Sequence, residues 1–447
     1  MKTADQAIGV PGALPFILEW RFTARGCSDR MLRSHFRVAM LCRGAVGAVR
    51  GAFSQKIMFR FVTAGESHGQ ALIAWISGVP AGVPMDMEYI RRELHRRQLG
   101  YGRGGRQKIE RDTAEALSGV RHGQTIGAPI ALRIENRDWA NWEKALPVED
   151  IAGGEDAQRR LTAPRPGHAD LAGALKFNLH DARYILERAS ARETAARVAA
   201  GAIAKMFLMQ FGIELLSHTI SVGKVKLERA ATWYEIRAAC ADLESPLRCV
   251  DPAVQERMKA EVDYVLRAGD SVGGVFEAIA RGVPAGLGSH AQWDEKLDGK
   301  LARAVMSIQA VKAVEIGSGV GNADAYGSEV QDEIGYDSGR HRFTRPTNRA
   351  GGIEGGITNG EDIVARGYLK PISTLRKALG TADLMTKQGI RAAYERSDVC
   401  VVPAAGVAGE AMMALVLAEA FLEKFGGDSL TETQRNFEGY KKQLDQF

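Results

Sequence analysis

The sequence predicts an α+β fold in which antiparallel sheets and helices form layers. Helical periodicity and short β-branched runs both occur from residue 58 onward, but they do not alternate regularly as in a doubly wound sheet. No linker, low-complexity tract or internal repeat interrupts this part of the chain. We therefore expect one domain over residues 58–430, preceded by an unstructured extension over residues 1–57 and followed by a C-terminal tail over residues 431–447.

Three helices are predicted from their periodicity and end signals. Asp86–Gln98 carries basic residues in its last turn, as the helix dipole favours, and glycines follow it. Ser190 and Glu193 have the spacing of a capping box and open a long helix. The buried stripe of that helix falls at Ala195, Val198, Ala199, Ala202, Ile203 and Met206. A last core helix runs from about Val407 to Phe425 and ends at a pair of glycines.

Strands are predicted where short β-prone runs lie between turn residues. The first covers Phe59–Ala64, and a compact apolar run follows at Gln70–Ile76. Further β-branched runs are Ala128–Ile134, Val311–Ile316 and Asp398–Val402.

Composition and charge exclude several classes of protein. The 447 residues are 45% hydrophobic and 25% charged, as in ordinary globular proteins. The formal net charge is +5, but residues 1–57 hold nine Lys or Arg and three Asp or Glu, which leaves 50 basic and 51 acidic residues in the remainder. The body is therefore not a general nucleic-acid binder. Residues 7–18 are too short and proline-broken to span a bilayer, so we expect no membrane association.

Residues 1–57 are Arg-rich and carry no sustained helical or strand period. They are either a targeting segment or a stretch upstream of a true translation start at Met58. The second interpretation is favoured because no apolar core and cleavage site of a signal peptide follow.

The five cysteines indicate a reducing compartment. They are odd in number, scattered, and include no Cys-x-x-Cys pair; they are Cys27, Cys42, Cys240, Cys249 and Cys400. This pattern favours free thiols in a cytoplasmic protein over a disulfide framework or a zinc site. We therefore expect no metal centre.

The segment Gly65-Glu66-Ser67-His68-Gly69 is the strongest candidate for a catalytic turn. Two glycines bracket a hydroxyl and an imidazole where the backbone turns tightly or approaches a ligand. Two roles are open at this point: a serine nucleophile, or a histidine that donates a proton to an anion.

Three basic clusters indicate an anionic ligand. The first surrounds the glycine-rich segment 100–105 and consists of Arg91, Arg92, Arg96, Arg97, Arg103, Arg106, Lys108 and Arg111. Its Gly-x-Gly-x-x-Gly pattern follows a basic helix rather than a strand, which excludes a dinucleotide fingerprint. We interpret it as a loop that carries arginines toward an anion, with a solvated charged turn as the alternative.

The other two clusters combine arginine with histidine or with a helix start. In the segment 165–170, a Pro-Gly turn holds Arg165, His168 and Asp170 together. In the segment 187–193, Arg188 and Arg192 lie where the helix dipole disfavours cations, which points to a bound phosphate. A plain capping box explains the serine and glutamate of that segment but not its arginines.

Several weaker candidates complete the pattern. Glycine-dense segments at 317–321 and 351–356 suit a flat cofactor, Lys370–Thr374 adds a cation and two hydroxyls, and Arg396–Asp398 adds a charged pair.

Together these segments resemble the chorismate synthase family. Gly65–Gly69 with its leading strand is similar to the first family signature, and Glu187–Thr194, continued to Ile203, is similar to the second. Arg396–Cys400, continued through Glu410 and Ala411, is similar to the third. The resemblance covers residues 59–425 but not residues 1–57, and three spaced motifs in the right order are far more specific than any one of them.

The resemblance implies a reaction, a fold and partners. Family members eliminate phosphate from 5-enolpyruvylshikimate 3-phosphate in a trans-1,4 reaction that gives chorismate. They require reduced FMN although there is no net redox change, with NADPH as a possible indirect reductant. The implied fold is a helical layer between antiparallel sheets. The implied partners are a phosphorylated small molecule, three further copies of the chain in a homotetramer, and an external flavin reductase or reductant.

The resemblance also implies roles for individual residues. His68 resembles the histidine that protonates the departing phosphate, His168 the one that keeps the flavin in its reactive protonation state, and Asp398 the carboxylate that takes the ring proton with flavin N5. Ser67 and Ser190 look like assistants that hold water or flavin. The implied flavin contacts are Arg188, Ala189, Ser190, Gln309, Ala310, Gly355, Lys370, Pro371, Ile372, Ser373, Thr374 and Arg396. The implied substrate or NADPH contacts are Arg97, Arg103, Arg165 and Arg192.

Two functions of other classes compete with this one. A serine hydrolase would use Ser67 in a Gly-x-Ser-x-Gly nucleophile elbow, but that fold needs strands and an oxyanion loop upstream, where only residues 1–57 lie. A non-catalytic flavin- or RNA-binding protein would use the cluster around residues 91–111, but this cluster lacks interleaved aromatic residues.

Overall fold

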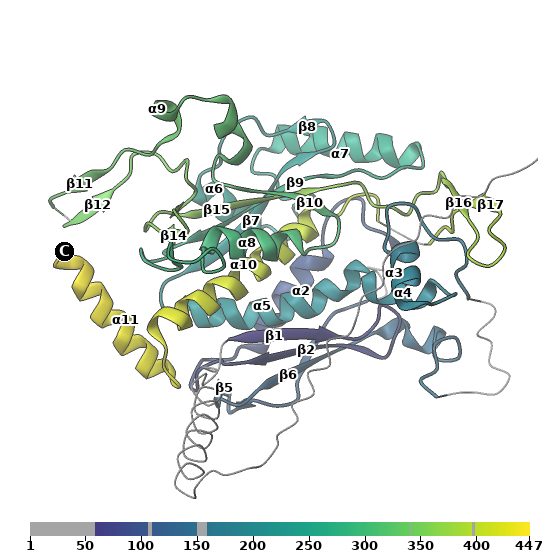
Figure 1. Ribbon diagram of the computed structural model, residues 1–447, viewed down its shortest axis with the longest axis horizontal. Helices are drawn as coiled ribbons and strands as arrows, with labels where there is room; N and C mark the ends of the chain where they lie inside the picture. Colours follow the sequence, from purple (N-terminus) through teal and green to yellow (C-terminus); the bar gives the residue numbers. More distant parts are fainter. Residues whose placement is uncertain (1–58, 106–109, 150–158, 340, 396–397) are drawn as a thin grey trace, which may run out of the picture. The chain divides into compact units, whose positions relative to one another are not determined.

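The structure is a computed structural model that describes residues 59–105, 110–149, 159–339, 341–395 and 398–447. The predicted extension over residues 1–57 lies outside the described residues, as do Arg106, Lys108 and Arg396. Within the described part of the chain, a layer of helices lies between two antiparallel sheets (Figure 1). The predicted α+β class and its layers are therefore confirmed.

The first sheet has four antiparallel strands. In spatial order these are β1 (Arg60–Ala64), β2 (Ala71–Ser77), β6 (Ile130–Glu135) and β3 (Ala114–Ala116). Strand β2 alternates strictly, with Leu72, Ala74 and Ile76 buried toward the helices. Strands β1 and β2 form a hairpin in which Ala64 pairs with Ile73, so the catalytic-turn candidate is the loop at its tip.

The second sheet has five antiparallel strands. In spatial order these are β10 (Val311–Ile316), β15 (Ile363–Leu369), β9 (Gly274–Arg281), β7 (Glu214–Val222) and β8 (Val225–Lys226). Phe276 of β9 is fully buried and packs where Gly406 and Gly409 leave space on the neighbouring helix. Strands β10 and β15 place the Gln309–Ala310 and Lys370–Thr374 segments at the same end of the sheet, since Val311 pairs with Leu369.

The layer between the sheets consists of α2 (Met87–Gln98), α5 (Thr194–Met209), α8 (Leu297–Met306) and α10 (Val402–Phe425). Helices α5 and α10 are buried on almost all sides, as an all-apolar helix requires. Among the described residues, α10 alone is long and apolar enough to cross a membrane, but 89% of its apolar window is buried inside the protein. It is the central core helix.

The remaining elements lie around this core. The helices are α3 (Asp170–Phe177), α4 (Arg183–Ala189), α6 (Trp233–Ala241), α7 (Pro252–Arg267), α9 (Gly327–Val330) and α11 (Leu430–Asp445). The 3-10 turns are η2 (Arg137–Asn141), η4 (Ala191–Glu193) and η5 (Gly319–Asp324). Short hairpins are formed by β4 (Val120–Arg121) with β5 (Gln124–Thr125), β11 (Gly335–Asp337) with β12 (Arg342–Thr344), β13 (Ile353–Glu354) with β14 (Ile357–Thr358), and β16 (Gly380–Ala382) with β17 (Gly389–Arg391).

The predicted helices are confirmed, with Asp86 as the N-cap of α2 and Gly426 at the end of α10. The strand prediction for Asp398–Val402 is wrong, because Val402 already begins α10, with a proline in its first turn. The C-terminal tail is helical, since Phe437 of α11 packs on Phe421 and Phe425 with ring centroids 5.3 and 5.2 Å apart. The domain limits stay a prediction.

The contact between α5 and α10 depends on a glycine. A Cβ added to Gly201 would lie 2.4 Å from the Cβ and 2.5 Å from the Cα of Ala411. We expect Gly201→Ala to lower the free energy of unfolding by about 1–3 kcal/mol through overpacking. Gly439→Ala in α11, where no atom lies within 4 Å, is the matched control and stabilises by up to about 1 kcal/mol. Urea unfolding compares the two, and equal effects would contradict close packing at this crossing.

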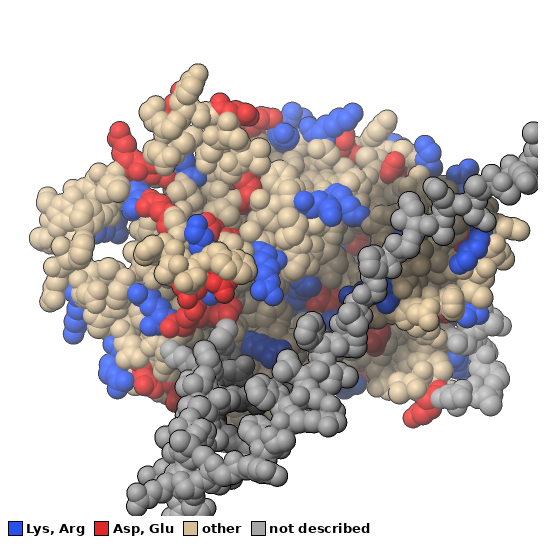
Figure 2. Space-filling view, in the orientation of Figure 1, with Lys and Arg blue, Asp and Glu red and all other residues tan. Residues whose placement is uncertain are grey.

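Charged residues are distributed over the face shown in Figure 2 with both signs interspersed. This agrees with the balance of basic and acidic residues beyond residue 57. The visible surface therefore offers no single basic field for a nucleic acid.

Candidate active site

The loop between β1 and β2 holds Ser67 and His68 in a fixed turn. Gly65 has φ +96°, and a Cβ there would lie 2.2 Å from the carbonyl oxygen of Ala71. The Asn136 amide donates to the carbonyl oxygens of Glu66 (3.0 Å) and Gly69 (2.7 Å). The loop is thus pinned to the end of β6.

The same loop excludes a nucleophile elbow. That motif needs a strand, a sharp turn and then a helix. Here the turn leads from β1 back into β2, and Ser67 is only 2% exposed. The serine hydrolase alternative is therefore not favoured.

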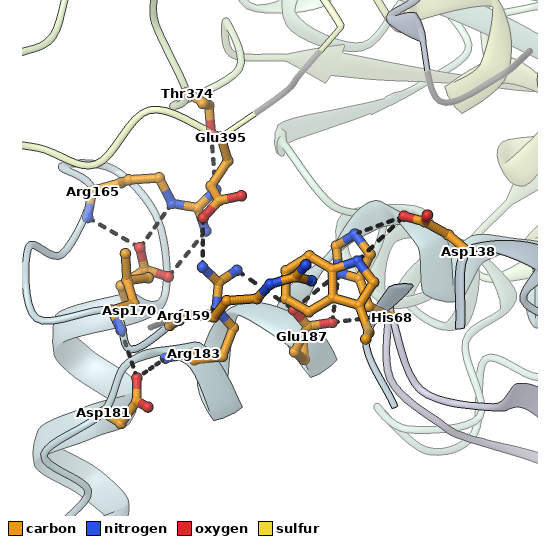
Figure 3. Close-up of polar contacts among 12 residues, drawn as sticks. His68, Asp138, Arg159, Arg165, Asp170, Asp181, Arg183, Glu187, Thr374 and Glu395 are labelled. Atoms are coloured by element: carbon orange, nitrogen blue, oxygen red, sulfur yellow. Dashed lines mark hydrogen bonds and ion pairs between the residues drawn. The ribbon is translucent and has the colours of Figure 1, made fainter. Parts of the chain in front are cut away.

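His68 is held by a carboxylate on α4. Its Nδ1 lies 3.0 Å from both carboxylate oxygens of Glu187, and its backbone N–H donates to Glu187 Oε2 at 2.8 Å (Figure 3). A carboxylate only accepts, so Nδ1 carries the proton and Nε2 is the nitrogen left to exchange a proton. Asp138 Oδ2 lies 3.9 Å from Nε2, and the imidazole stacks on Trp142 at 4.1 Å.

His168 is held in a similar way at the start of α3. Its Nδ1 lies 2.5 Å from Asp170 Oδ1, which also places the proton on Nδ1. Burial alone would raise the pKa of Asp170, but hydrogen bonds from His168 and Arg165 and the charge of Arg165 outweigh it and hold the pKa well below its usual value. Arg165 also donates to Thr374 Oγ1 at 2.9 Å. The predicted Arg–His–Asp cluster is therefore brought together by its tight turn.

Arg97 and Arg192 share one buried carboxylate. Arg192 Nη1 lies 2.5 Å from Asp112 Oδ1, and Arg97 Nη1 lies 3.3 Å from Asp112 Oδ2. Arg192 also donates to Asn136 Oδ1 at 3.0 Å, which links this pair to the His68 loop. The sequence led us to expect that a bound phosphate balances the charge of Arg192. Asp112 supplies part of that negative charge instead.

The two arginines lie among several other buried charges. Burial is the largest influence on Arg97, and together with the nearby charges of Arg192 and Arg103 it outweighs Asp112 and lowers the pKa of Arg97 to about 10. Arg192 Nη2 also lies 3.7 Å from Glu110 Oε2, so two buried carboxylates face the two guanidinium groups.

Arg103 and Asp398 meet across the glycine-rich loop. Arg103 Nε lies 3.4 Å from Asp398 Oδ2, and the backbone N–H of Gly104 donates to Asp398 Oδ1 at 2.5 Å. Gly102 accepts a hydrogen bond from the N–H of Val399 at 2.7 Å, so the loop clamps the segment before α10. The arginine predicted to reach toward an anion is here paired with the predicted proton-accepting carboxylate.

The predicted flavin contacts form a chain from α4 to the second sheet. Arg188 donates to Thr63 Oγ1 at 2.9 Å, and Thr63 donates to Glu193 at 2.6 Å. Glu193 then accepts from Gln309 Nε2 at 3.1 Å, while Gln309 Oε1 is buried and has no hydrogen-bond partner among the described residues. Glu193 therefore faces Thr63 and Gln309, so the predicted capping box is wrong, although Ser190 Oγ does cap the N–H of Arg192 at 3.2 Å.

The chain continues to the His168 turn. Ala310 has φ +70° and accepts a hydrogen bond from the N–H of Lys370 at 3.0 Å. The Lys370 ammonium donates to the carbonyl oxygen of Gly167. Of the segment that follows, Ile372 accepts from Ser271 Oγ at 2.6 Å, and Thr374 contacts Arg165 as described. Strands β10 and β15 thus deliver this segment beside His168.

Among the described residues, no hydrogen bond joins the predicted flavin contact Gly355 to this chain of contacts. Gly355 lies at the turn between β13 and β14, where the next residue contacts the start of α8 through the N–H of Leu297. Arg396 lies outside the described residues. Ala189 is the last residue of α4, next to Arg188. Pro371 and Ser373 fall within the segment that follows β15.

Sequence reasoning missed several residues that hold the site. Asp112 and Asn136 are spread over short irregular segments and carry no motif of their own. Glu187 was part of a motif, but its place next to Arg188 in the sequence does not indicate that it contacts a histidine 119 residues away. Trp142 was not identified as a site residue, because it lies next to η2 and belongs to no motif. The described part of the chain contains no His, Cys, Asp or Glu group able to hold a metal ion, and its cysteines, Cys240, Cys249 and Cys400, are buried free thiols.

Comparisons with known proteins agree on one family. The family model described as chorismate synthase matches residues 59–422. A chorismate synthase of Solibacter usitatus is 63% identical over 390 residues, which cover 87% of this chain and all of that protein. A second from Acidobacterium capsulatum is 61% identical over 395 residues, with 87% and 100% covered. A crystal structure of chorismate synthase matches with a TM-score of 0.70 at 43% identity, covering 87% of this chain and 99% of that one. The chain therefore belongs to the chorismate synthase family of lyases, which serve the shikimate pathway of aromatic amino acid biosynthesis.

Proposed function

We propose that the chain eliminates phosphate from 5-enolpyruvylshikimate 3-phosphate in a trans-1,4 reaction that yields chorismate, with reduced FMN and without net redox change. The observation that carries the proposal is the pair His68–Glu187, whose loop Asn136 links to the buried arginine Arg192 and through Asp112 to Arg97. Membership of the family supports the substrate and product.

The departing phosphate requires cations and a proton donor. Arg97 and Arg192 supply the cations, and their shared partner Asp112 fixes where their guanidinium groups point. His68 supplies the proton from Nε2, because Glu187 occupies Nδ1. Ser67 beside it, with its backbone N–H bonded to the carbonyl oxygen of Glu187 at 3.0 Å, helps to hold this geometry.

The residues described fit a flavin. A buried amide oxygen of Gln309 without a partner offers an acceptor for a ring N–H, and Arg188 and Lys370 offer cations for a phosphate. Bound reduced FMN would supply an electron-rich ring beside the substrate. His168 would face it from the turn held by Lys370, with Asp170 keeping its Nδ1 protonated.

We propose that Asp398 accepts the ring proton of the substrate. Its carboxylate is oriented by Arg103 and by the N–H of Gly104. We expect Asp398→Asn to lower turnover by about 10²–10⁴-fold, because an amide cannot act as the base. Measurement with substrate deuterated at the abstracted position checks the role. An unchanged rate with an unchanged isotope effect would remove Asp398 from the proton transfer. Asp263→Asn, whose carboxylate accepts from the Tyr101 hydroxyl at 2.8 Å, is the carboxylate control.

The function itself is tested by product stoichiometry. Supplied with 5-enolpyruvylshikimate 3-phosphate and dithionite-reduced FMN under anaerobic conditions, the protein is expected to release one phosphate for each chorismate formed. Phosphate release without chorismate would indicate hydrolysis and contradict the proposal. No release from folded protein that binds FMN would also contradict it.

We further propose that the protein works in the cytoplasm as a homotetramer. Its buried free thiols support a reducing compartment. Because no part of the sequence resembles a flavin reductase, we expect an external reductant, with NADPH acting indirectly through it.

A further inference from the structure

Arg159 is a cation beside His68 that the sequence motifs did not single out. The four arginines assigned to the substrate are each matched with a carboxylate: Arg97 with Asp112, Arg192 with Asp112 and Glu110, Arg103 with Asp398, and Arg165 with Asp170. Among the contacts in the described part of the chain, the Arg159 guanidinium meets only the ring of Trp142, at 4.1 Å. No carboxylate in the described ranges therefore forms a direct ion pair with it.

The position of Arg159 is fixed by the backbone. Its carbonyl oxygen accepts a hydrogen bond from Arg183 Nε at 3.0 Å. Two residues further on, the N–H of Leu161 donates to Asp181 Oδ1 at 2.8 Å, and the same oxygen accepts from the N–H of Arg183 at 2.8 Å. The segment that carries Arg159 is thus tied to the start of α4, the helix that also carries Glu187.

Trp142 places this cation next to the candidate proton donor. The imidazole of His68 stacks on Trp142 with ring centroids 4.1 Å apart, so His68 and Arg159 contact the same indole. Asp138 Oδ2 accepts from Trp142 Nε1 at 3.3 Å and holds the indole in place. Stacking leaves the in-plane N–H groups of a guanidinium available for a bidentate contact with an oxyanion.

The neighbouring carboxylates are occupied by other cations. Glu187 contacts His68 at 3.0 Å and lies 3.6 Å from Arg183, and Glu395 contacts Arg183 at 2.7 Å. A phosphate monoester carries nearly two negative charges and accepts several hydrogen bonds. It is the ligand class that best satisfies a fixed guanidinium that has no carboxylate partner among the described residues and shares its indole with the candidate proton donor.

We propose that Arg159 is a further substrate-binding residue, which contacts the phosphate group that His68 protonates. This inference rests on the proposed function for the identity of the substrate. The claim that Arg159 binds a phosphate group does not depend on that function. Trp142 acts as the platform that orients Arg159 and His68 toward the same group.

The test compares ligands with and without the phosphate. Calorimetry measures the dissociation constants of shikimate 3-phosphate and of shikimate for wild type, Arg159→Ala, Arg159→Lys and Arg160→Ala. Arg160 is the matched control, because it is the adjacent arginine and is exposed. Loss of a charge-assisted hydrogen bond is expected to raise the dissociation constant of shikimate 3-phosphate about 10- to 100-fold in Arg159→Ala.

The control measurements separate binding from folding. Shikimate affinity is expected to stay within about twofold in every variant, Arg160→Ala is expected to resemble wild type, and Arg159→Lys is expected to recover part of the loss. Equal losses in the two alanine variants, or equal losses for both ligands, would overturn the proposal. A thermal unfolding midpoint unchanged in Arg159→Ala excludes a folding defect as the cause.

The outcome is independent of turnover. If wild type binds shikimate 3-phosphate through Arg159 but makes no chorismate, the proposed function fails and the phosphate contact stands. If wild type makes chorismate and Arg159→Ala binds shikimate 3-phosphate normally, the contact fails and the function stands.

Discussion

Replacement of His68 by alanine is expected to lower turnover by about 10²–10⁴-fold, the usual contribution of a positioned general acid. The reason is geometric: Glu187 holds Nδ1 at 3.0 Å, so only Nε2 can deliver the proton to the departing phosphate. FMN binding should persist, because His68 is not part of the Thr63–Glu193–Gln309 chain of hydrogen bonds that links the residues assigned to the flavin. Steady-state kinetics and flavin titration measure the two effects separately.

The pH dependence distinguishes a proton donor from a structural histidine. A donor that acts as imidazolium loses activity as pH rises through the histidine pKa, and the variant lacks this limb. His95→Ala, on the exposed side of α2, is the control with the same chemical change. Turnover of His68→Ala close to that of wild type, with the alkaline limb intact, would exclude His68 from the protonation step.

Replacement of Lys205 by methionine is expected to lower the free energy of unfolding by about 3–5 kcal/mol. Lys205 of α5 is buried between two carboxylates: its Nζ donates to Glu93 Oε2 at 2.6 Å and to Glu410 Oε2. Removing the ammonium leaves Arg96 alone to neutralise both carboxylates. Lys259→Met, which breaks an exposed pair with Glu256, is the control and should change stability by less than about 1 kcal/mol.

The pH range of this stabilisation follows from the pKa directions. Burial would raise the pKa of Glu410, but the charges of Arg96 and Lys205 outweigh it and lower the pKa to about 2. Its contribution is therefore present above the unfolded pKa of 4.5 and is lost as pH falls toward 2. The pKa of Lys205 is raised, since the charges of Glu410 and Glu93 outweigh burial, so its contribution is lost only above the unfolded value of 10.5. Urea unfolding at pH 7 and near pH 3 measures the difference, and a Lys205→Met defect as large at pH 3 as at pH 7 would contradict this account.

The elements that the sequence predicted are those with strong local signals. Helix α2 begins at Asp86 because a carboxylate N-cap and a basic last turn both favour that register. The segment 398–402 has the composition of a strand, yet Val402 begins α10, because packing of that helix between the sheets outweighs β-propensity. Local preference alone could not distinguish these two outcomes.

The candidate site was predictable where one short segment carries the whole arrangement. The Arg165–Asp170 turn is such a case, since its three charged residues contact each other directly. The partners of His68 and Arg192 were not predictable, because Glu187, Asp112 and Asn136 reach them only through the layering of distant elements. The expected placement of Arg188 and Arg192 at a helix start suggested a phosphate. That placement is wrong for Arg188, which lies in the last turn of α4 where the dipole favours a cation, and Arg192 lies in η4 beside Asp112.

The central claim is that the elimination uses reduced flavin without consuming it. The most direct test counts the chorismate molecules formed for each FMNH₂ supplied under strict anaerobic conditions, with no other reductant present. The account predicts many turnovers for each reduced flavin, with the flavin still reduced at the end and no product when only oxidised FMN is given. One chorismate for each flavin oxidised, or equal rates with oxidised flavin, would contradict it.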